Sequence, residues 1–237
     1  MRYFGLMLLP MVLVLAPAAS AQPQEGVYFT PKIGYSSLEA DSSAQIEAVG
    51  LGRVSGKDKS TKGQAVLGLA VGYDFNLVND VPLRAEFEYA WRGKKEMVNE
   101  RFDAVNPPND GNIKSKVGAQ SFFFNGYFDI HNDSPVTPYI GAGLGLARVS
   151  SESLVTIDNV PGNMSISKTK TNFAWNIGAG AAFEISDSVV LDVGYRYADF
   201  GKVDGSTSVV VPPYTINASM DTKVKTHEVL LGLRFTM

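Results

Sequence analysis

The feature that most constrains this chain is an alternation of apolar and polar residues with a period of two. From Gly26 onward this period dominates, and the helical period of 3.6 never persists over the ~11 residues needed to recognise a helix. Each alternating segment is close to the ~9–11 residues that a tilted strand needs to cross a bilayer. Eight segments are predicted as strands: 27–37, 64–75, 81–92, 116–130, 137–149, 172–185, 188–199 and 224–236.

Apolar side chains gather on one face of these predicted strands, because successive side chains of a strand point to opposite sides of its sheet. In the third segment, Phe87 and Trp91 share one face, whereas Arg84 and Glu88 share the other. A soluble barrel would turn its apolar side chains inward and its charges to water. Here the apolar face holds nearly every aromatic residue, and a single sheet offers it no second layer to pack on. The sequence therefore predicts that hydrocarbon lipid surrounds the barrel.

The fourth segment needs its own assignment because Phe122, Phe123 and Phe124 are consecutive. The alternation is satisfied by one choice of faces. It puts Phe122, Phe124 and Phe128 outward, and Asn125, Tyr127 and Asp129 inward.

The inward face is predicted to hold charges that neutralise one another. Eight strands enclose a bore too narrow for a wide pore, and buried charges need partners whatever the protein does. A structural filling of paired charges is the main interpretation, and a gated ion path is the alternative. Glycines such as Gly178 and Gly180 share this face, where they leave room for large side chains from opposite strands. The predicted interior network consists of Lys32, Asp74, Arg84, Glu86, Glu88, Arg92, Asp129, Glu184, Asp192, Arg196, Glu228 and Arg234.

The connections between the predicted strands alternate strictly between short and long. Short ones follow the second, fourth and sixth strands, at 76–80, 131–136 and 186–187. Long, polar ones follow the other strands, at 38–63, 93–115, 150–171 and 200–223. All long connections therefore lie at one end, as in bacterial outer-membrane barrels, which have short periplasmic turns and long extracellular loops. We predict an all-β fold, an eight-stranded antiparallel up-and-down transmembrane barrel closed between its first and last strands.

The N-terminus has the pattern of a secretory signal peptide. Arg2 is the only charge in the first 24 residues, and an apolar run at 6–15 follows it. This run is about half the ~20 residues of a membrane-spanning helix. Ala19-Ser20-Ala21 then forms a small-x-small cleavage site. We predict a signal peptide at 1–21 and an outer-membrane barrel domain at 22–237, with both barrel termini in the periplasm.

Composition excludes several other classes of protein. The chain has 21 Lys and Arg against 24 Asp and Glu, and the basic residues are scattered, so nucleic acid is not an expected partner. It has no cysteine and two histidines, His131 and His227, which leaves little for a metal site. No catalytic, cofactor-binding or metal-binding residue is therefore predicted. His227 could serve as a base in a lipid hydrolase, but its neighbours Thr226 and Glu228 include no serine nucleophile.

Three motifs rich in glycine and aromatic residues lie in the fifth, seventh and eighth predicted strands: Thr137-Pro138-Tyr139-Ile140-Gly141-Ala142-Gly143-Leu144-Gly145, Leu191-Asp192-Val193-Gly194-Tyr195-Arg196-Tyr197 and Val229-Leu230-Leu231-Gly232-Leu233-Arg234-Phe235. They resemble small outer-membrane β-barrels of the opacity-protein, surface-antigen and OmpA-like family. The resemblance covers the whole mature chain. It implies contact with outer-membrane lipid and lipopolysaccharide, and recognition of the C-terminal strand by the barrel-insertion machinery. Members of the family commonly end on an aromatic residue, whereas here Thr236 and Met237 follow Phe235.

Three functions agree with these features. The preferred one is a non-enzymatic surface protein whose long loops serve adhesion, act as antigens or maintain the envelope, with host or surface ligands at the loops. Function concentrates in loops that a rigid scaffold carries. The alternatives are a porin that conducts small solutes or ions, and an outer-membrane lipid hydrolase or acyltransferase.

Overall fold

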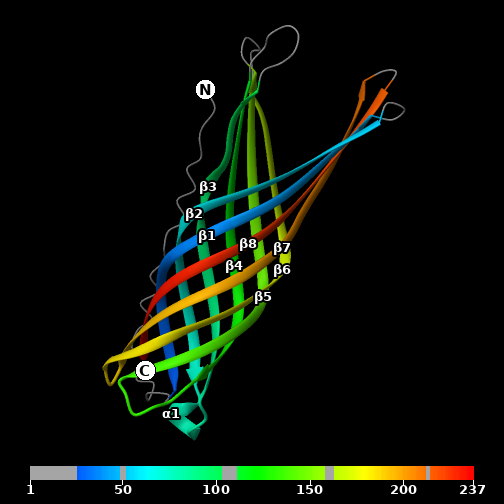
Figure 1. The fold of residues 1–237 in the computed structure, drawn as a ribbon. Helices are drawn as coiled ribbons and strands as arrows, with labels where there is room; N and C mark the ends of the chain where they lie inside the picture. The colour runs from blue at the N-terminus through cyan, green and yellow to red at the C-terminus, as the bar shows by residue number, and fades with distance from the viewer. Residues whose placement is uncertain (1–25, 49–51, 103–110, 158–162, 212–213) are drawn as a thin grey trace, which may run out of the picture.

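The protein forms one closed sheet of eight antiparallel strands (Figure 1). This computed structural model describes residues 26–48, 52–102, 111–157, 163–211 and 214–237, so the predicted signal peptide lies outside the described residues. A short helix, α1 (Asn76–Asn79), connects the second and third strands. The strands are β1 (Val27–Ala48), β2 (Gly52–Asp74), β3 (Leu83–Phe102), β4 (Gly111–Asp129), β5 (Val136–Ile157), β6 (Asn163–Ser186), β7 (Val189–Val211) and β8 (Tyr214–Thr236).

Every strand pairs with its neighbours in the chain, and β1 pairs with β8 to close the barrel, as at Tyr35 opposite Val229. The predicted up-and-down topology is therefore confirmed. Closure leaves no unpaired strand edge within the lipid-facing part, where water is not available to satisfy backbone groups. Among the described residues, no helix has the length and hydropathy of a membrane span.

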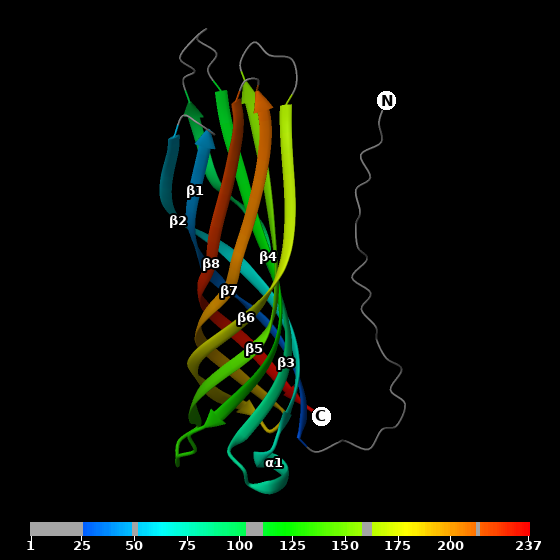
Figure 2. The ribbon, with the colours of Figure 1, turned by 90° about the vertical axis from the view of Figure 1, so that its right-hand side faces the viewer.

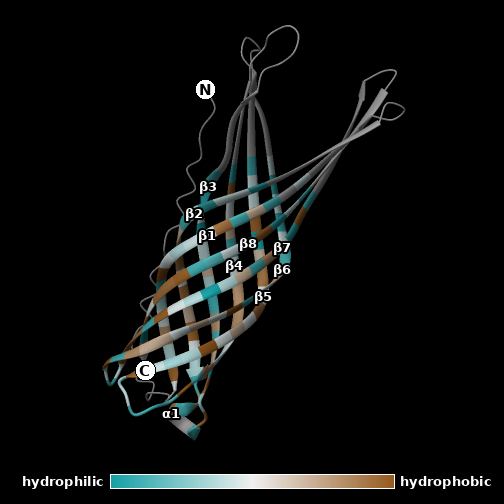
Figure 3. Ribbon diagram, in the orientation of Figure 1, coloured by the Kyte–Doolittle hydropathy of each residue, from teal (hydrophilic) through white to brown (hydrophobic). Residues whose placement is uncertain are grey.

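Exposed apolar side chains cover the outer surface of the barrel towards the end with the short turns, and we call them the lipid belt. Figure 3 shows hydrophobic residues, in brown, recurring along the strands in this part of the barrel. Phe124 is 63% exposed and Leu144 is 61% exposed, values that a side chain in a soluble core would never reach. The predicted faces of β4 are confirmed, because Phe122, Phe124 and Phe128 are exposed, whereas Asn125 and Asp129 are buried. Further members of the belt are Ile33, Leu67, Val71, Phe87, Trp91, Ile140, Leu146, Phe173, Ile177, Tyr195, Val229 and Leu231.

The strands are much longer than the sequence analysis predicts. The connections expected to be long loops are mostly hairpin arms, because strand pairing continues as far as Ala48 opposite Gly52 and Val211 opposite Tyr214. The alternation of apolar and polar residues marks only the length of strand that faces lipid. Beyond the lipid both faces of a hairpin meet water, so the pairing continues there without an apolar face to reveal it.

The barrel divides into two sheets above the lipid belt. Pairing of β2 with β3 ends at Val66 opposite Arg92, and pairing of β6 with β7 ends at Trp175 opposite Asp199. All other strand pairs continue beyond these points. Figures 1 and 2 show the result, which we call the fork: β7, β8, β1 and β2 lean one way, and β3 to β6 continue upward as a second sheet.

A bulge in β7 accompanies the separation of β6 from β7. The register with β8 shifts between Asp199 and Lys202, and Gly201 within this step has a φ of 76°, which a residue with a side chain rarely adopts. Polar contacts still join β6 and β7 beyond the point where their pairing ends. Asn172 donates a hydrogen bond of 3.1 Å to the Phe200 carbonyl oxygen, and Lys170 forms an ion pair with Asp204. The hydrogen bond from Lys170 holds the pKa of the exposed Asp204 carboxyl below its ordinary value.

Candidate functional site

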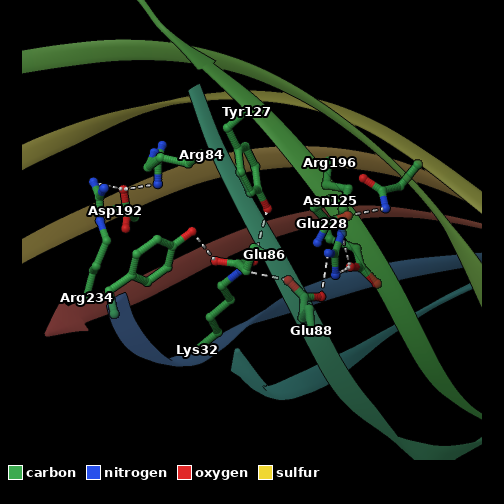
Figure 4. Close-up of polar contacts among 12 residues, drawn as sticks. Lys32, Arg84, Glu86, Glu88, Asn125, Tyr127, Asp192, Arg196, Glu228 and Arg234 are labelled. Atoms are coloured by element: carbon green, nitrogen blue, oxygen red, sulfur yellow. Dashed lines mark hydrogen bonds and ion pairs between the residues drawn. The ribbon is translucent and has the colours of Figure 1, made fainter. Parts of the chain in front are cut away.

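The barrel interior contains a chain of buried charges that alternate in sign (Figure 4). It begins at Glu86, which pairs with Lys32, and Lys32 Nζ lies 2.7 Å from Glu88 Oε2. Arg196 pairs with Glu88 and with Glu228, at 2.5 Å and 2.7 Å. Arg92 completes the chain with two hydrogen bonds to Glu228, at 2.5 Å and 3.0 Å. Each inner member thus touches two partners of opposite charge, which offsets the cost of removing it from water.

A second chain of alternating charges lies nearer the short turns. Arg84 donates two hydrogen bonds to Asp129, at 2.7 Å and 2.8 Å, and its Nη1 is 3.9 Å from Asp192. Arg234 pairs with Asp192 at 3.2 Å and with Asp74 at 3.3 Å. The two chains together bring every residue of the predicted interior network into ion pairs, with the exception of Glu184.

Glu184 lies apart from the network, contrary to the sequence prediction. It is exposed near the end of β6, next to a register shift between Glu184 and Ser186. No ion pair joins it to any residue that the structure describes. Glu184 keeps the alternation, since Phe183 and Ile185 on either side of it are exposed and it lies opposite Val190 in the regular register. Its exposure follows from its place at the end of β6, beyond the last buried residues of the network.

Aromatic rings pack against the arginines of both chains. The Arg84 guanidinium lies 5.0 Å from the ring centres of both Tyr127 and Tyr139, and Arg92 lies 4.7 Å from that of Phe200. The hydroxyl of Tyr127 also donates a 3.2 Å hydrogen bond to Glu86. Sequence analysis assigned Tyr127 inward but missed Tyr139 and Phe200. Extending the alternation through β5 could have indicated Tyr139. Phe200, on β7, falls in a segment that was predicted as a loop.

The space left inside the network is small. A cavity of about 50 Å³ lies between Lys32, Arg84, Tyr127 and Arg196, which is room for a few water molecules. Glycines form part of its wall: a Cβ atom on Gly194 would lie 2.7 Å from the Tyr139 hydroxyl. The absence of a side chain there therefore allows the Tyr139 ring to fill the bore.

An apolar cluster closes the bore at the level of the fork, and we call it the apolar plug. Phe123 and Phe200 are completely buried, and their ring centres are 6.4 Å apart. Sequence analysis did not predict the plug, because it considered only charges and glycines for the interior. The inward parity of Phe123 and the small apolar residues of the predicted strands, such as Ala147 and Val149, were the available signals. The buried members of the plug are Leu38, Ala40, Ala119, Phe123, Ala147, Val149, Ala174, Ala198, Phe200 and Val224.

His227 lies on the outer surface, on the face of β8 that also carries the lipid belt. Its Nδ1 is 2.6 Å from the Tyr195 hydroxyl, and its ring contacts Tyr197 edge-on at 5.2 Å between ring centres. Its polar contact is thus a tyrosine on the neighbouring strand, where a catalytic triad would place a serine and a carboxylate. The geometry is that of an aromatic cluster at the edge of the lipid belt.

A closed antiparallel barrel with an apolar exterior and a charged interior defines an integral outer-membrane protein. The chain belongs to the family of the outer membrane protein beta-barrel domain, which matches residues 6–235.

Comparison with individual proteins agrees with this assignment. The chain is 32% identical to the outer membrane protein PagN of Salmonella typhimurium over 238 residues, 99% of this chain and 98% of PagN. It is 31% identical over 140 residues to a protein of Rickettsia conorii named as a candidate adhesin, covering 54% of this chain and 53% of that protein. The barrel also superposes on OprG of Pseudomonas aeruginosa with a TM-score of 0.53 and 16% identity, over 91% of this chain and 99% of OprG, which shows a shared fold.

Proposed function

We propose that this outer-membrane barrel is a non-enzymatic surface protein that makes contact with host or other surface ligands through its long hairpins. One observation carries the proposal: at one end only, the strands continue past the lipid belt and divide into two four-stranded sheets. A barrel that served only as a membrane anchor would need no such extension. Similarity to a candidate adhesin of Rickettsia conorii supports a role in attachment.

The interior supports a structural filling in preference to a channel. The predicted network residues, Glu184 excepted, have partners of opposite charge, and the apolar plug lies between them and the hairpin tips. An ion crossing the bore would have to break buried ion pairs and then enter a dry apolar region.

The proposal includes an orientation in the membrane. The long hairpins would face the outside of the cell, and the short turns and both barrel termini would face the periplasm, as in other bacterial barrels. Residues 1–21 would serve as the export signal and be removed. The C-terminal strand β8, which seals the barrel against β1, would be the segment that the insertion machinery recognises.

Accessibility of single cysteines tests the orientation. Because the native chain contains no cysteine, one introduced thiol reports only its own position. Ser167→Cys lies exposed on the β6 arm of a hairpin, and Asp133→Cys lies exposed in the short turn between β4 and β5. On intact cells, a maleimide that cannot cross membranes should label Ser167→Cys. Asp133→Cys should react only after the outer membrane is permeabilised, and the reverse pattern would contradict the orientation.

Shortened hairpins test the contact with surfaces. In one variant residues 203–222 are removed, and Lys202 and Lys223, which face each other in the register, are joined by an Asn-Gly turn. Equivalent cuts shorten the other three hairpins. A non-adherent laboratory bacterium that expresses the native protein should bind cultured epithelial cells, and at least one shortened variant should lose most of that binding while remaining in the outer membrane. Binding at the native level by all four shortened variants would refute the proposal.

A further inference from the structure

The register places four outward-facing residues in one row across β3, β4, β5 and β6. Trp91 lies opposite Gln120, Gln120 opposite Arg148, and Arg148 opposite Thr171. Directly opposite residues on neighbouring strands have Cβ atoms about 4.5–5.5 Å apart, so adjacent members of this row can contact one ligand together. We call these four residues the Arg148 row.

The Arg148 row marks the edge of the lipid belt. The next outward row towards the membrane is apolar and consists of Tyr89, Phe122, Leu146 and Phe173, and Phe173 is 63% exposed. On these strands the surface therefore changes from hydrocarbon to polar within one row. Trp91, which is 43% exposed, is the type of residue that anchors barrels at the depth of lipid headgroups.

Arg148 is an uncompensated cation at this depth. It is exposed, and it has no ion-pair or hydrogen-bond partner in the part of the chain that the structure describes. The nearest acid on the same strand face, Glu152, is already paired with Lys94. Gln120 and Thr171, on either side of Arg148, carry no charge that could neutralise it.

The opposite wall of the barrel provides a contrast. On β8, Lys225 occupies a comparable outward position, but it lies opposite Asp199 on β7 and opposite Glu39 on β1. Glu39 also pairs with Lys59 at 3.2 Å, so two cations and two carboxylates lie together on this wall and their charges sum to zero. The excess of positive charge at the edge of the belt is a property of the Arg148 row, and Lys225 is a natural control for it.

We propose that the Arg148 row binds a phosphate group of lipopolysaccharide. The guanidinium of arginine presents a planar pair of donors that matches phosphate geometry. The Gln120 amide and the Thr171 hydroxyl lie beside it and can donate to the remaining phosphate oxygens. The acyl chains of the lipid would then continue along Phe122, Leu146 and Phe173.

The choice of lipopolysaccharide rests on the orientation given under Proposed function. In that orientation the Arg148 row lies in the outer leaflet, where the lipid carries phosphates on its sugar backbone. In the reverse orientation the same row would meet the phosphates of phospholipids. Binding to a purified protein does not depend on orientation, so the two proposals can fail separately.

Binding of lipid A by the purified, folded protein in detergent micelles tests the proposal. The probes are fluorescent lipid A with its phosphates and the same lipid after chemical removal of the phosphates. The native protein should bind the phosphorylated form about tenfold more tightly, the scale of a charge-assisted contact. Arg148→Gln should lose this preference, and Lys225→Gln should keep it.

Three results would overturn the proposal. The first is an equal preference for phosphorylated lipid A in the native protein and in Arg148→Gln. The second is an equal loss of preference in Lys225→Gln, which would indicate a general effect of surface charge. The third is displacement of lipid A by the same concentration of phosphatidylglycerol, which would show that any lipid phosphate suffices. Circular dichroism and the mobility of unheated protein on gels establish that each variant is folded before binding is compared.

Discussion

Arg196 on β7 joins two carboxylates from distant parts of the chain: its Nη1 is 2.5 Å from Glu88 Oε1 on β3, and its Nη2 is 2.7 Å from Glu228 Oε2 on β8. All three side chains are almost completely buried. Arg196 therefore links strands on different walls of the barrel through its interior, and it is a central member of the longer charge chain.

Removal of Arg196 should destabilise the barrel strongly. Arg196→Met leaves Glu88 and Glu228 with one cationic partner each, and breaking a buried pair in this way costs about 3 to 5 kcal/mol. Urea unfolding in lipid vesicles should show this loss in the free energy of unfolding. Neutralising Glu88 as well, in Arg196→Met/Glu88→Gln, should restore part of it, because Lys32 keeps Glu86 as a partner and Arg92 keeps Glu228.

The matched control for that variant is an exposed ion pair. Lys202 and Asp221 lie 3.1 Å apart and both are about half exposed. Lys202→Met should therefore lower the free energy of unfolding by less than about 1 kcal/mol. A similar loss for Lys202→Met and Arg196→Met would contradict the structural role of the interior network.

The apolar plug should keep the barrel from conducting ions. In planar bilayers the native protein is expected to give no discrete current steps. Replacing the two plug rings and the central arginine, in Phe123→Ser/Phe200→Ser/Arg196→Ala, removes both the apolar barrier and part of the ion-pair network, so current steps should appear in this variant. A native protein that conducts would instead favour a channel, provided that Arg196→Ala/Asp192→Ala changes the size of the current.

A charge placed in the middle of the lipid belt should impair folding into membranes. Phe124→Arg introduces a cation at an exposed position on β4, where arginine near the bilayer midplane costs about 2 to 4 kcal/mol. Thr169→Arg, on β6 and outside the belt, should cost at most about 1 kcal/mol. The yield of folded protein in vesicles measures the effects of both substitutions. Equal yields for the two variants would show that Phe124 does not face lipid.

The packing of Tyr28 against Gly72 can be tested by a double-mutant cycle. A Cβ atom on Gly72 would lie 2.2 Å from Tyr28 Cζ, and the contacts found there all belong to the Tyr28 side chain. Gly72→Ala should therefore cost about 1 to 3 kcal/mol in free energy of unfolding through overpacking. In a Tyr28→Ala background this cost should nearly vanish, and an undiminished cost would show that the clash is not with the ring.

The part of the fold in contact with lipid could be predicted from the sequence because hydrocarbon imposes a strict pattern. Although Phe122, Phe123 and Phe124 are consecutive, the alternation placed Phe122 and Phe124 correctly on the outer face. The hairpin arms could not be predicted in the same way. Residues such as Lys59 and Lys223 lie in paired strands with water on the outside, and no apolar face records that pairing.

The interior could be predicted as a set of residues but not as a set of partners. Parity alone put Glu88 and Arg196 inside the barrel, yet their contact depends on the registers of the four strand pairs between β3 and β7. Glu184 was misplaced because parity does not show that this residue lies at the exposed end of β6. Arg148 was not singled out, since its significance comes from the uncharged residues opposite it.

The hairpin arms make the reach of this protein above the membrane adjustable. Each arm of a hairpin is paired along its length, so residues can be added or removed in opposing pairs without disturbing the lipid belt or the ion pairs below. Every such pair changes the height by about 3.4 Å. Surface tips could thus diverge among relatives in length and chemistry while the membrane anchor stays constant.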